Sequence, residues 1–342
     1  MRQKHRRWII TVAVLVTPLI FLLCVGIGSV NYTPAEIMQV LWNGIRGNLH
    51  ETSGNGVANV ILKIRLPRVC TVALVGAALA LCGTAMQGLL KNPLADGSTL
   101  GVSSGASLGA VFAIALGLHI PMIGSIGVTV MSILFAFLSI ILILTLAHIL
   151  DYSLSTNTII LVGVIFSMFA GSVTNLLVTF AGDKVKNIMF WTMGSFTGTT
   201  FQDAGIVLLA LIFCSILLLN LSAELNAFAM GEENAIHIGV NVRRVKLLIM
   251  IAVSILLGIS VSVSGSIGFV GLVIPHIARF MVGPNHKKLL PISMWLGSIF
   301  LLLADLISRT ILSPAVLPIG VITSFVGSIF FIYIFYTLRT KQ

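Results

Sequence analysis

Charged residues are scarce in this sequence of 342 residues, where Asp, Glu, Lys and Arg together make up only 9%. Hydrophobic residues account for 57%, and the mean hydropathy is +1.09. A water-soluble domain of this length needs more charge to cover its surface and would otherwise expose large apolar patches. The scarcity of charge therefore excludes an ordinary soluble protein and predicts a chain whose solvent is a lipid bilayer.

Cysteine is also rare, and the sequence lacks the motifs of several kinds of site. Cys24, Cys70, Cys82 and Cys214 lie in apolar stretches, without a CxxC spacing or neighbouring histidines. We expect them to be small buried residues rather than metal ligands or a disulfide. The phosphate-binding pattern GxxxxGK[ST] and any catalytic cluster are missing as well. We therefore expect a chain that is not an enzyme, binds no cofactor or metal and leaves ATP hydrolysis to another subunit.

Long apolar runs are abundant. A membrane-spanning helix needs about 20 mostly apolar residues, and ten segments qualify. They predict an all-α polytopic membrane protein with about ten spans in a single domain, 1–342. The first run is interpreted as a span because it is longer than the core of a signal peptide. The predicted spans are 8–28, 66–90, 98–118, 122–148, 158–181, 203–221, 245–264, 266–283, 289–312 and 316–338.

The basic residues indicate the orientation of these spans. A net charge of +10 would suit a nucleic-acid partner, but the basic residues sit at the ends of the apolar runs. With ten spans and a cytoplasmic N-terminus, 13 basic residues lie on the cytoplasmic side and 7 on the outer side. Cytoplasmic loops carry such an excess, so we expect both termini in the cytoplasm and no nucleic-acid partner. The outer set is Arg46, Lys63, Arg65, Arg68, Lys184, Lys186 and Arg309.

Two predicted spans carry a small residue at every fourth position, which is typical of close helix packing. The first stripe is Gly101, Gly105 and Gly109, and the second begins at Gly163. Because the second stripe continues with polar residues, an alternative stays open, in which this face lines a pathway. The candidate pathway residues are Ser167, Gly171, Asn175 and Thr179.

Ionisable residues within or beside a span are uncommon and suggest a function. Asp305 and Arg309 are four positions apart, so they share a helix face and can pair. Arg65 and Arg68 flank Pro67 at the outer mouth of the second span. The planar guanidinium group binds carboxylates through two hydrogen bonds, which makes Arg65, Arg68 and Arg309 candidates for docking an acidic external partner. Simple anchoring at the membrane surface is the alternative.

The largest cytoplasmic loop, 222–244, contains the stretch GEENAIHIG at 231–239. Its pattern E-x-x-A-x-x-x-G predicts a short helix bounded by glycines. Such a helix would project Ile236 and Ile238 into a groove on a cytoplasmic partner. The candidate coupling residues are Gly231, Glu232, Ala235, Ile236 and Gly239.

Several motifs occur together in a specific order: LPR at 66–68, GAALA at 76–80, QG at 87–88, NPLA at 92–95, LGVSSGA at 100–106, GSIGFVGLVIPHIAR at 265–279, LAD at 303–305 and LPIGV at 317–321. In this order the sequence resembles the iron-siderophore/vitamin B12 (FecCD-type) permease family. The resemblance extends over about 8–338.

The resemblance implies the multi-pass permease subunit of a type II ABC importer in the cell membrane. Such a subunit pairs with a second, identical or different permease, with ATPase subunits that bind ATP and Mg, and with an extracytoplasmic substrate-binding protein. The resemblance also implies a coupling segment at 223–242, binding-protein contacts at Arg65, Arg68 and Arg309, and a pathway beside 158–181 and 316–338.

The expected cargo is an iron-siderophore complex, because most members of that family import iron chelates. Haem and cobalamin are alternatives within the family, and an ion-coupled secondary transporter is a more distant one. A secondary transporter would need coupling-ion residues near the middle of the membrane, and the sequence shows no acidic network there. The sequence does not identify the chelate, the ATPase, the binding protein or the second permease.

Overall fold

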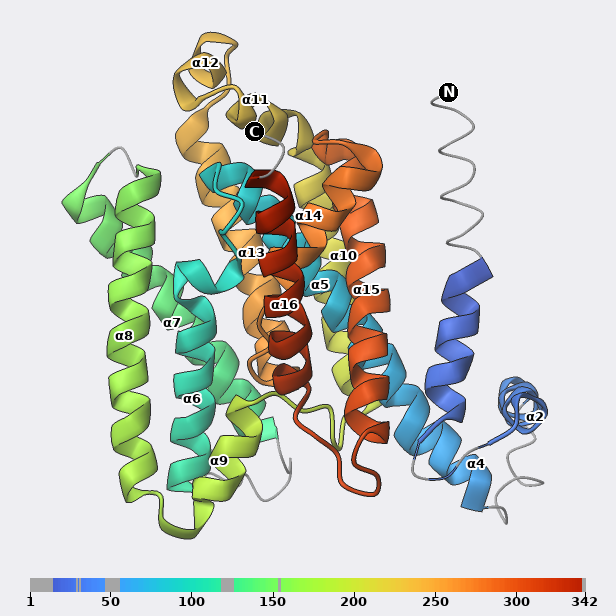
Figure 1. Ribbon diagram of the computed structural model, residues 1–342. Helices are drawn as coiled ribbons and strands as arrows, with labels where there is room; N and C mark the ends of the chain where they lie inside the picture. Colours follow the sequence, from blue (N-terminus) through green and yellow to red (C-terminus); the bar gives the residue numbers. More distant parts are fainter. Residues whose placement is uncertain are drawn as a thin grey trace.

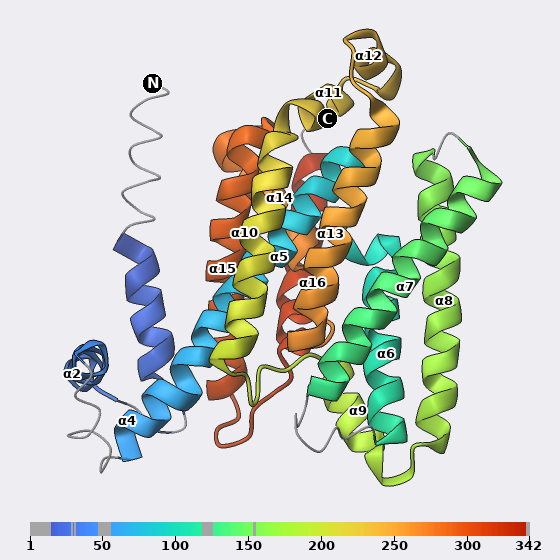
Figure 2. The same ribbon diagram turned by 180° about the vertical axis from the view of Figure 1, so that it is seen from behind.

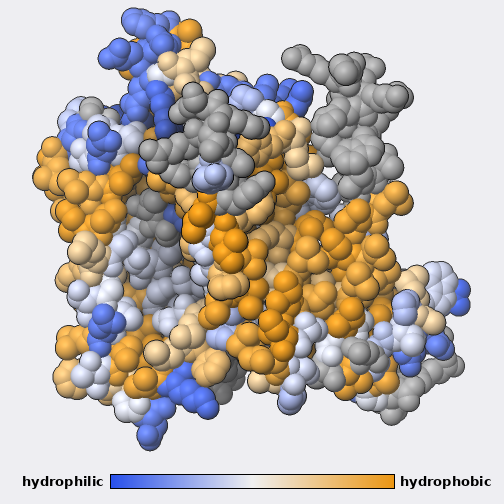
Figure 3. Space-filling model, viewed as in Figure 1, coloured by the Kyte–Doolittle hydropathy of each residue, from blue (hydrophilic) through white to orange (hydrophobic). Residues whose placement is uncertain are grey.

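The computed structural model describes residues 15–339, except 29, 31, 47–55, 118–125 and 153–154. Over the described residues every regular element is a helix, and the long helices run side by side (Figure 1). On the face shown in Figure 3, apolar side chains cover the middle of the molecule and polar ones gather at its two ends. This arrangement confirms the all-helical, membrane-embedded class, because lipid satisfies apolar side chains but no backbone polar groups.

Six helical stretches of the described chain are long and apolar enough to cross a membrane. The first is continuous from α4 (Gly56–Val60) through the π-helix η1 (Ile61–Arg65) into α5 (Leu66–Leu90). The others are α7 (Ile126–Leu150), α8 (Thr156–Phe180), α10 (Phe201–Asn220), α13 (Val242–Ser264) and α15 (His286–Thr310).

Four shorter apolar helices complete the bundle: Leu15–Gly26, here called the first helix, α6 (Val102–Leu116), α14 (Val270–Val282) and α16 (Ile319–Arg339). The remaining helices lie at the ends of the bundle or beside it: α2 (Pro34–Ile45), η2 (Gly97–Leu100), η3 (Gly182–Lys184), α9 (Val185–Thr192), α11 (Ser222–Ala229) and α12 (Glu232–His237). In Figure 1, α11 and α12 form the upper end and α4 and α9 the lower end.

Each apolar helix falls on one of the predicted segments, although several boundaries differ, two of them for a clear structural reason. The second span begins at Gly56 rather than 66, because α4 and η1 continue α5 without a break. The eighth begins at Val270 rather than 266, because Gly265 ends α13 with a positive φ of 68°. A Cβ on Gly265 would lie 2.2 Å from the carbonyl oxygen of Trp191, so glycine alone fits there. The number of ten spans and the cytoplasmic termini stay predictions, since residues 1–14 lie outside the described part.

Helix α5 is the centre of the bundle, and Figures 1 and 2 show α10, α13, α14 and α15 around it. Glycines let the neighbouring backbones approach closely. A Cβ on Gly76 of α5 would lie 2.3 Å from the carbonyl oxygen of Gly297 in α15, and the reverse distance is also 2.3 Å. A Cβ on Gly83 would lie 1.9 Å from the carbonyl oxygen of Gly271 in α14. These contacts fix α14 and α15 against α5.

Non-helical connections are tied together by backbone hydrogen bonds where α9, α13 and α16 meet. The Ser195 N–H donates to the Ser264 carbonyl at 2.8 Å, and the Ile319 N–H donates to the Gly194 carbonyl at 3.0 Å. Irregular backbone at membrane depth is tolerated only where protein or a water-filled cavity satisfies it. The turn predicted around 262–268 is therefore a buried junction of three connections.

Candidate functional site

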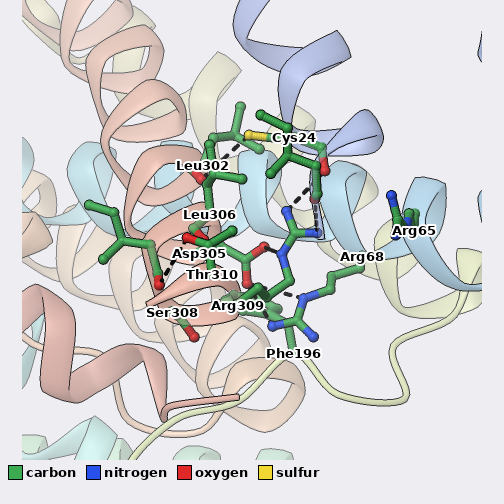
Figure 4. A network of polar contacts seen from close by, with 12 residues as sticks. Cys24, Arg65, Arg68, Phe196, Leu302, Asp305, Leu306, Ser308, Arg309 and Thr310 are labelled. Atoms are coloured by element: carbon green, nitrogen blue, oxygen red, sulfur yellow. Dashed lines mark hydrogen bonds and ion pairs between the residues drawn. The ribbon is translucent and has the colours of Figure 1, made fainter. Parts of the chain in front are cut away.

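Four charged residues meet at the end of the bundle opposite to α11 and α12. Arg68 lies in the first turn of α5, whereas Asp305 and Arg309 lie on successive turns near the end of α15. Arg68 donates from Nη2 to Oδ1 of Asp305 at 2.8 Å and from Nε to the same oxygen at 3.1 Å. Nε of Arg309 lies 2.9 Å from Oδ2 of Asp305, which confirms the predicted pairing of these two residues. With Arg65 they form the arginine cluster, shown in Figure 4.

Arg65 and Arg309 bind the C-terminal end of the first helix. Nη2 and Nη1 of Arg309 donate to the carbonyl oxygens of Cys24 and Ile27 at 2.9 and 3.1 Å. Nη1 of Arg65 donates to the carbonyl oxygens of residues 25 and 26 at 2.9 and 2.8 Å. The last carbonyls of a helix lack intrahelical donors and carry a partial negative charge. The two arginines therefore satisfy these carbonyls and attach the first helix to α5 and α15.

The arginines predicted to dock an external partner are largely buried within this chain. Asp305 is fully buried, Arg65 is 6% exposed and Arg309 is 8% exposed. The three arginines instead line one cavity of about 330 Å³, together with Tyr32 and apolar side chains. Arg65 also stacks on the Tyr32 ring, 4.6 Å from its centroid. Docking at these arginines stays a prediction, and it would require a carboxylate to reach into the cavity.

A third basic residue of the predicted outer set caps another helix. Nζ of Lys184 donates to the carbonyl oxygen of Ala115 in the last turn of α6 at 3.0 Å. Arg46 lies over the ring of Trp42, 4.5 Å from its centroid. Five of the seven basic residues of the predicted outer set thus have partners within this chain, at helix C-termini, on Asp305 or on an aromatic ring. This explains how they fit there without contradicting the predicted orientation.

At the opposite end, the coupling segment 223–242 folds as α11 followed by α12. The predicted short helix bounded by glycines is confirmed: α12 starts after Gly231, with φ 120°, and is followed by Gly239, with φ 89°. The N–H of Val240 donates to the Ala235 carbonyl at 3.0 Å, the bond of a helix that ends on a left-handed residue. Nothing lies within 4 Å of a Cβ placed on Gly239, so φ rather than space selects glycine.

Glu232 attaches α12 to two membrane helices. Its carboxylate lies 2.8 Å from Nζ of Lys246 on α13, and Oγ1 of Thr156 at the start of α8 donates to it at 3.1 Å. Lys246 is 1% exposed, and a buried ammonium needs such a partner. Sequence reasoning missed both partners, because the separations of 14 and 76 residues form no local pattern.

The other predicted coupling residues divide between the inside and the surface of α12. Ala235 is fully buried against the bundle, whereas Ile236 is 59% exposed and Ile238, just after the helix, is 61% exposed. Two exposed isoleucines at the end of a short helix are suited to an apolar groove of another protein. The structure therefore gives α12 an inner face that is fixed and an outer face that is free within this chain.

The two stripes of small residues have different surroundings. A Cβ on Gly105 or Gly109 would lie 2.5 Å or less from atoms of α7, so the first stripe packs α6 against α7. On α8, a Cβ on Gly171 would meet no atom within 4 Å, and Asn175 and Thr179 are exposed. Only Ser167, half-buried, lies nearer the bundle. The pathway candidates thus form an uncovered, partly polar face on one membrane helix, and their role stays a prediction.

Comparison with known proteins identifies the family of the chain. The model of the FecCD transport family matches residues 15–337. An ABC transporter permease protein of Bacillus subtilis, YvrB, is 44% identical and covers 90% of this chain and 87% of its own length. The cobalamin import system permease protein BtuC of Halobacterium salinarum is 38% identical over 83% of this chain and 74% of its own.

A solved structure of a transport protein has the same fold as this chain. A protein described as a metal-chelate type ABC transporter, in an inward-facing conformation, superposes with a TM-score of 0.82 at 31% identity. The match covers 97% of this chain and 99% of that one. The chain is thus a transport component and not an enzyme, a multi-pass protein of the cell membrane, and it belongs to the FecCD transport family of ABC importer permeases.

Proposed function

We propose that this chain translocates a ferric siderophore, delivered by a substrate-binding protein and driven by ATP hydrolysis on separate ATPase subunits. The observation that carries the proposal is the coupling segment. Its short helix α12 is fixed to α8 and α13 through Glu232 and presents Ile236 and Ile238 to an external groove. A permease without nucleotide-binding residues needs such a contact, because ATP bound elsewhere must favour one packing of its helices over another.

The binding protein is proposed to dock at the opposite end, on the arginine cluster. Three arginines and a single carboxylate, Asp305, leave an excess of positive charge around the cavity. A carboxylate that enters the cavity would form charge-assisted hydrogen bonds with guanidinium groups. Replacing Arg68 by Gln should weaken binding-protein docking at least tenfold, whereas Lys186→Gln, at an exposed lysine on α9, should leave docking unchanged. Equal binding by both variants would place the docking site elsewhere.

The pathway is proposed to run along the uncovered face of α8, closed by a second permease subunit. This location would explain why Gly171, Asn175 and Thr179 face away from their own bundle. A ferric siderophore is favoured as cargo over haem or cobalamin on the prevalence of iron chelates in the family. The relatives include a cobalamin permease, so the cargo has to be measured.

Uptake of radiolabelled compounds by a strain that lacks this chain tests the function. The panel contains several ferric siderophores labelled with radioactive iron, together with labelled haem and cobalamin. We expect loss of one siderophore class, restored by the wild-type chain and inhibited by vanadate. Loss of haem or cobalamin uptake alone would show that the cargo is that compound and not a siderophore. Uptake that resists vanadate but is abolished by an uncoupler would favour a secondary transporter.

A further inference from the structure

The coupling segment has a second attachment to the membrane helices, at α11 rather than α12. Oδ1 of Asn226 on α11 accepts a hydrogen bond from the backbone N–H of His286 at 2.9 Å and contacts Nδ1 of the same residue at 2.9 Å. Nδ2 of Asn226 donates to Oδ1 of Asn285 at 3.2 Å. Asn285 is the N-cap of α15. One amide side chain therefore engages the first two residues of the α15 terminus.

These contacts define the chemical roles of the atoms. A backbone N–H can only donate, so the Asn226 atom beside it is the carbonyl oxygen, and Nδ1 of His286 must carry a proton to donate to it. In the neutral ring Nε2 is then the unprotonated nitrogen, and it has no hydrogen-bond partner in the described structure. His286 is 4% exposed. Its ring is held by Asn226 on one side and by packing on the other.

The packing partner of the His286 ring is helix α5. A Cβ on Gly88 would lie 2.4 Å from Nε2, so only glycine leaves room for the ring. Helices α5 and α15 are joined again at mid-length, where Oγ of Ser298 donates to the Ala73 carbonyl at 2.7 Å. The Arg68 to Asp305 ion pair joins them at the far end. A displacement of α11 would therefore reach a helix pair that is tied along its whole length and ends at the arginine cluster.

We propose that Asn226 and His286 are positioning residues that transmit movement of the coupling segment to the α5–α15 pair, and through it to the arginine cluster. The inference rests on the proposed function, because it assumes that ATPase subunits move this segment. It adds a second route to the one through Glu232, which leads to α8 and α13 instead. With two routes, movement of the segment reaches α8 and α13 through Glu232 and α5 and α15 through Asn226.

The test uses the full chain in complex with the ATPase subunits that copurify with it, in lipid nanodiscs. Spin labels are placed at the exposed outer ends of α8 and α15, at Phe180→Cys and Thr310→Cys, in a reference protein whose four cysteines are replaced by alanine. The distance between the labels is measured before and after addition of ATP and vanadate. ATP hydrolysis without vanadate is recorded for the same samples.

We expect ATP and vanadate to shift the label distance in the reference protein, and Asn226→Ala to reduce the shift at least threefold while basal hydrolysis stays within twofold. His286→Ala should do the same, and the double variant should be no worse than either single one, because the two residues act as a unit. Asn226→Asp keeps the acceptor oxygen and should retain the shift. Asn234→Ala is the matched control, since Asn234 donates only within the segment, to Met230 at 2.8 Å.

A full shift in Asn226→Ala, or an equal loss in Asn234→Ala, would overturn the inference while the proposed function stands. Failure of both Asn226→Ala and Asn226→Asp to assemble with the ATPases would also overturn it, since Asn226 would then serve folding alone. If ATP and vanadate do not change the label distance in the reference protein, the proposed ATP-driven function is contradicted, and so is this inference.

Discussion

Helices α5 and α8 have the same length of 25 residues, and both are apolar with interspersed small residues, yet their surroundings are opposite. Nearly every residue of α5 is buried, and its glycines touch the backbones of α14 and α15. Only four residues of α8 are buried, and a Cβ on Gly171 would meet no atom of another element within 4 Å. A pattern of small residues therefore does not by itself show whether another helix of the same chain covers it.

The largest expected effect comes from filling the contact of α5 with α14. In Gly83→Val the added side chain meets the Gly271 backbone, which cannot yield without moving α14. Overpacking costs about 1–3 kcal/mol, and more where backbone must shift, so we expect most of the folded protein to be lost. The amount of monodisperse protein after detergent extraction measures the effect.

The matched variant on α8 is Gly171→Val, whose added Cβ meets no atom of another element within 4 Å. It should yield as much folded protein as the wild type and lower uptake at least tenfold, since the added side chain would enter the proposed pathway. Normal yield of Gly83→Val would show that α5 packs less tightly than the structure indicates. Normal uptake by Gly171→Val would show that the pathway does not run along this face of α8.

A smaller effect is expected where charge rather than volume binds α5 to its neighbours. Asp305→Asn leaves Arg68 and Arg309 without their counter-ion in a buried site, and breaking such a group costs about 3–5 kcal/mol. The midpoint of thermal unfolding should fall clearly. Asp203→Asn is the control, because this exposed carboxylate only caps the start of α10 and contributes about 1 kcal/mol. Equal shifts in both variants would mean that the buried ion pairs contribute little.

The smallest expected effect comes from a pair of glycine-to-alanine variants that differ in backbone conformation but not in the space around the added methyl group. A methyl group added to Gly239 or to Gly205 would meet no other atom within 4 Å, but only Gly239 has a positive φ. Gly239→Ala should cost roughly 1–2 kcal/mol in strain and reduce transport severalfold by disordering the end of α12. Gly205→Ala, inside α10, should be neutral or slightly stabilising. Unchanged transport in Gly239→Ala would mean that the end of α12 does not need this turn.

Sequence reasoning located the elements of the site but not their contacts. The pairing of Asp305 with Arg309 and the helix between Gly231 and Gly239 were predicted because both depend on residues a few positions apart. The second partner of Asp305, which is Arg68, and the partner of Glu232, which is Lys246, are on other helices. No periodicity in a single sequence joins such residues.

By itself, the sequence determined the membrane environment, the apolar segments and the short glycine-bounded helix, because hydropathy and backbone conformation are local properties of the chain. Only the tertiary structure decided that Arg65 and Arg309 are buried and bind the end of the first helix, and that Asn226 meets the start of α15. It also decided which stripe of small residues is covered within the chain. These outcomes depend on which helices become neighbours, and lipid and protein satisfy an apolar helix face almost equally well.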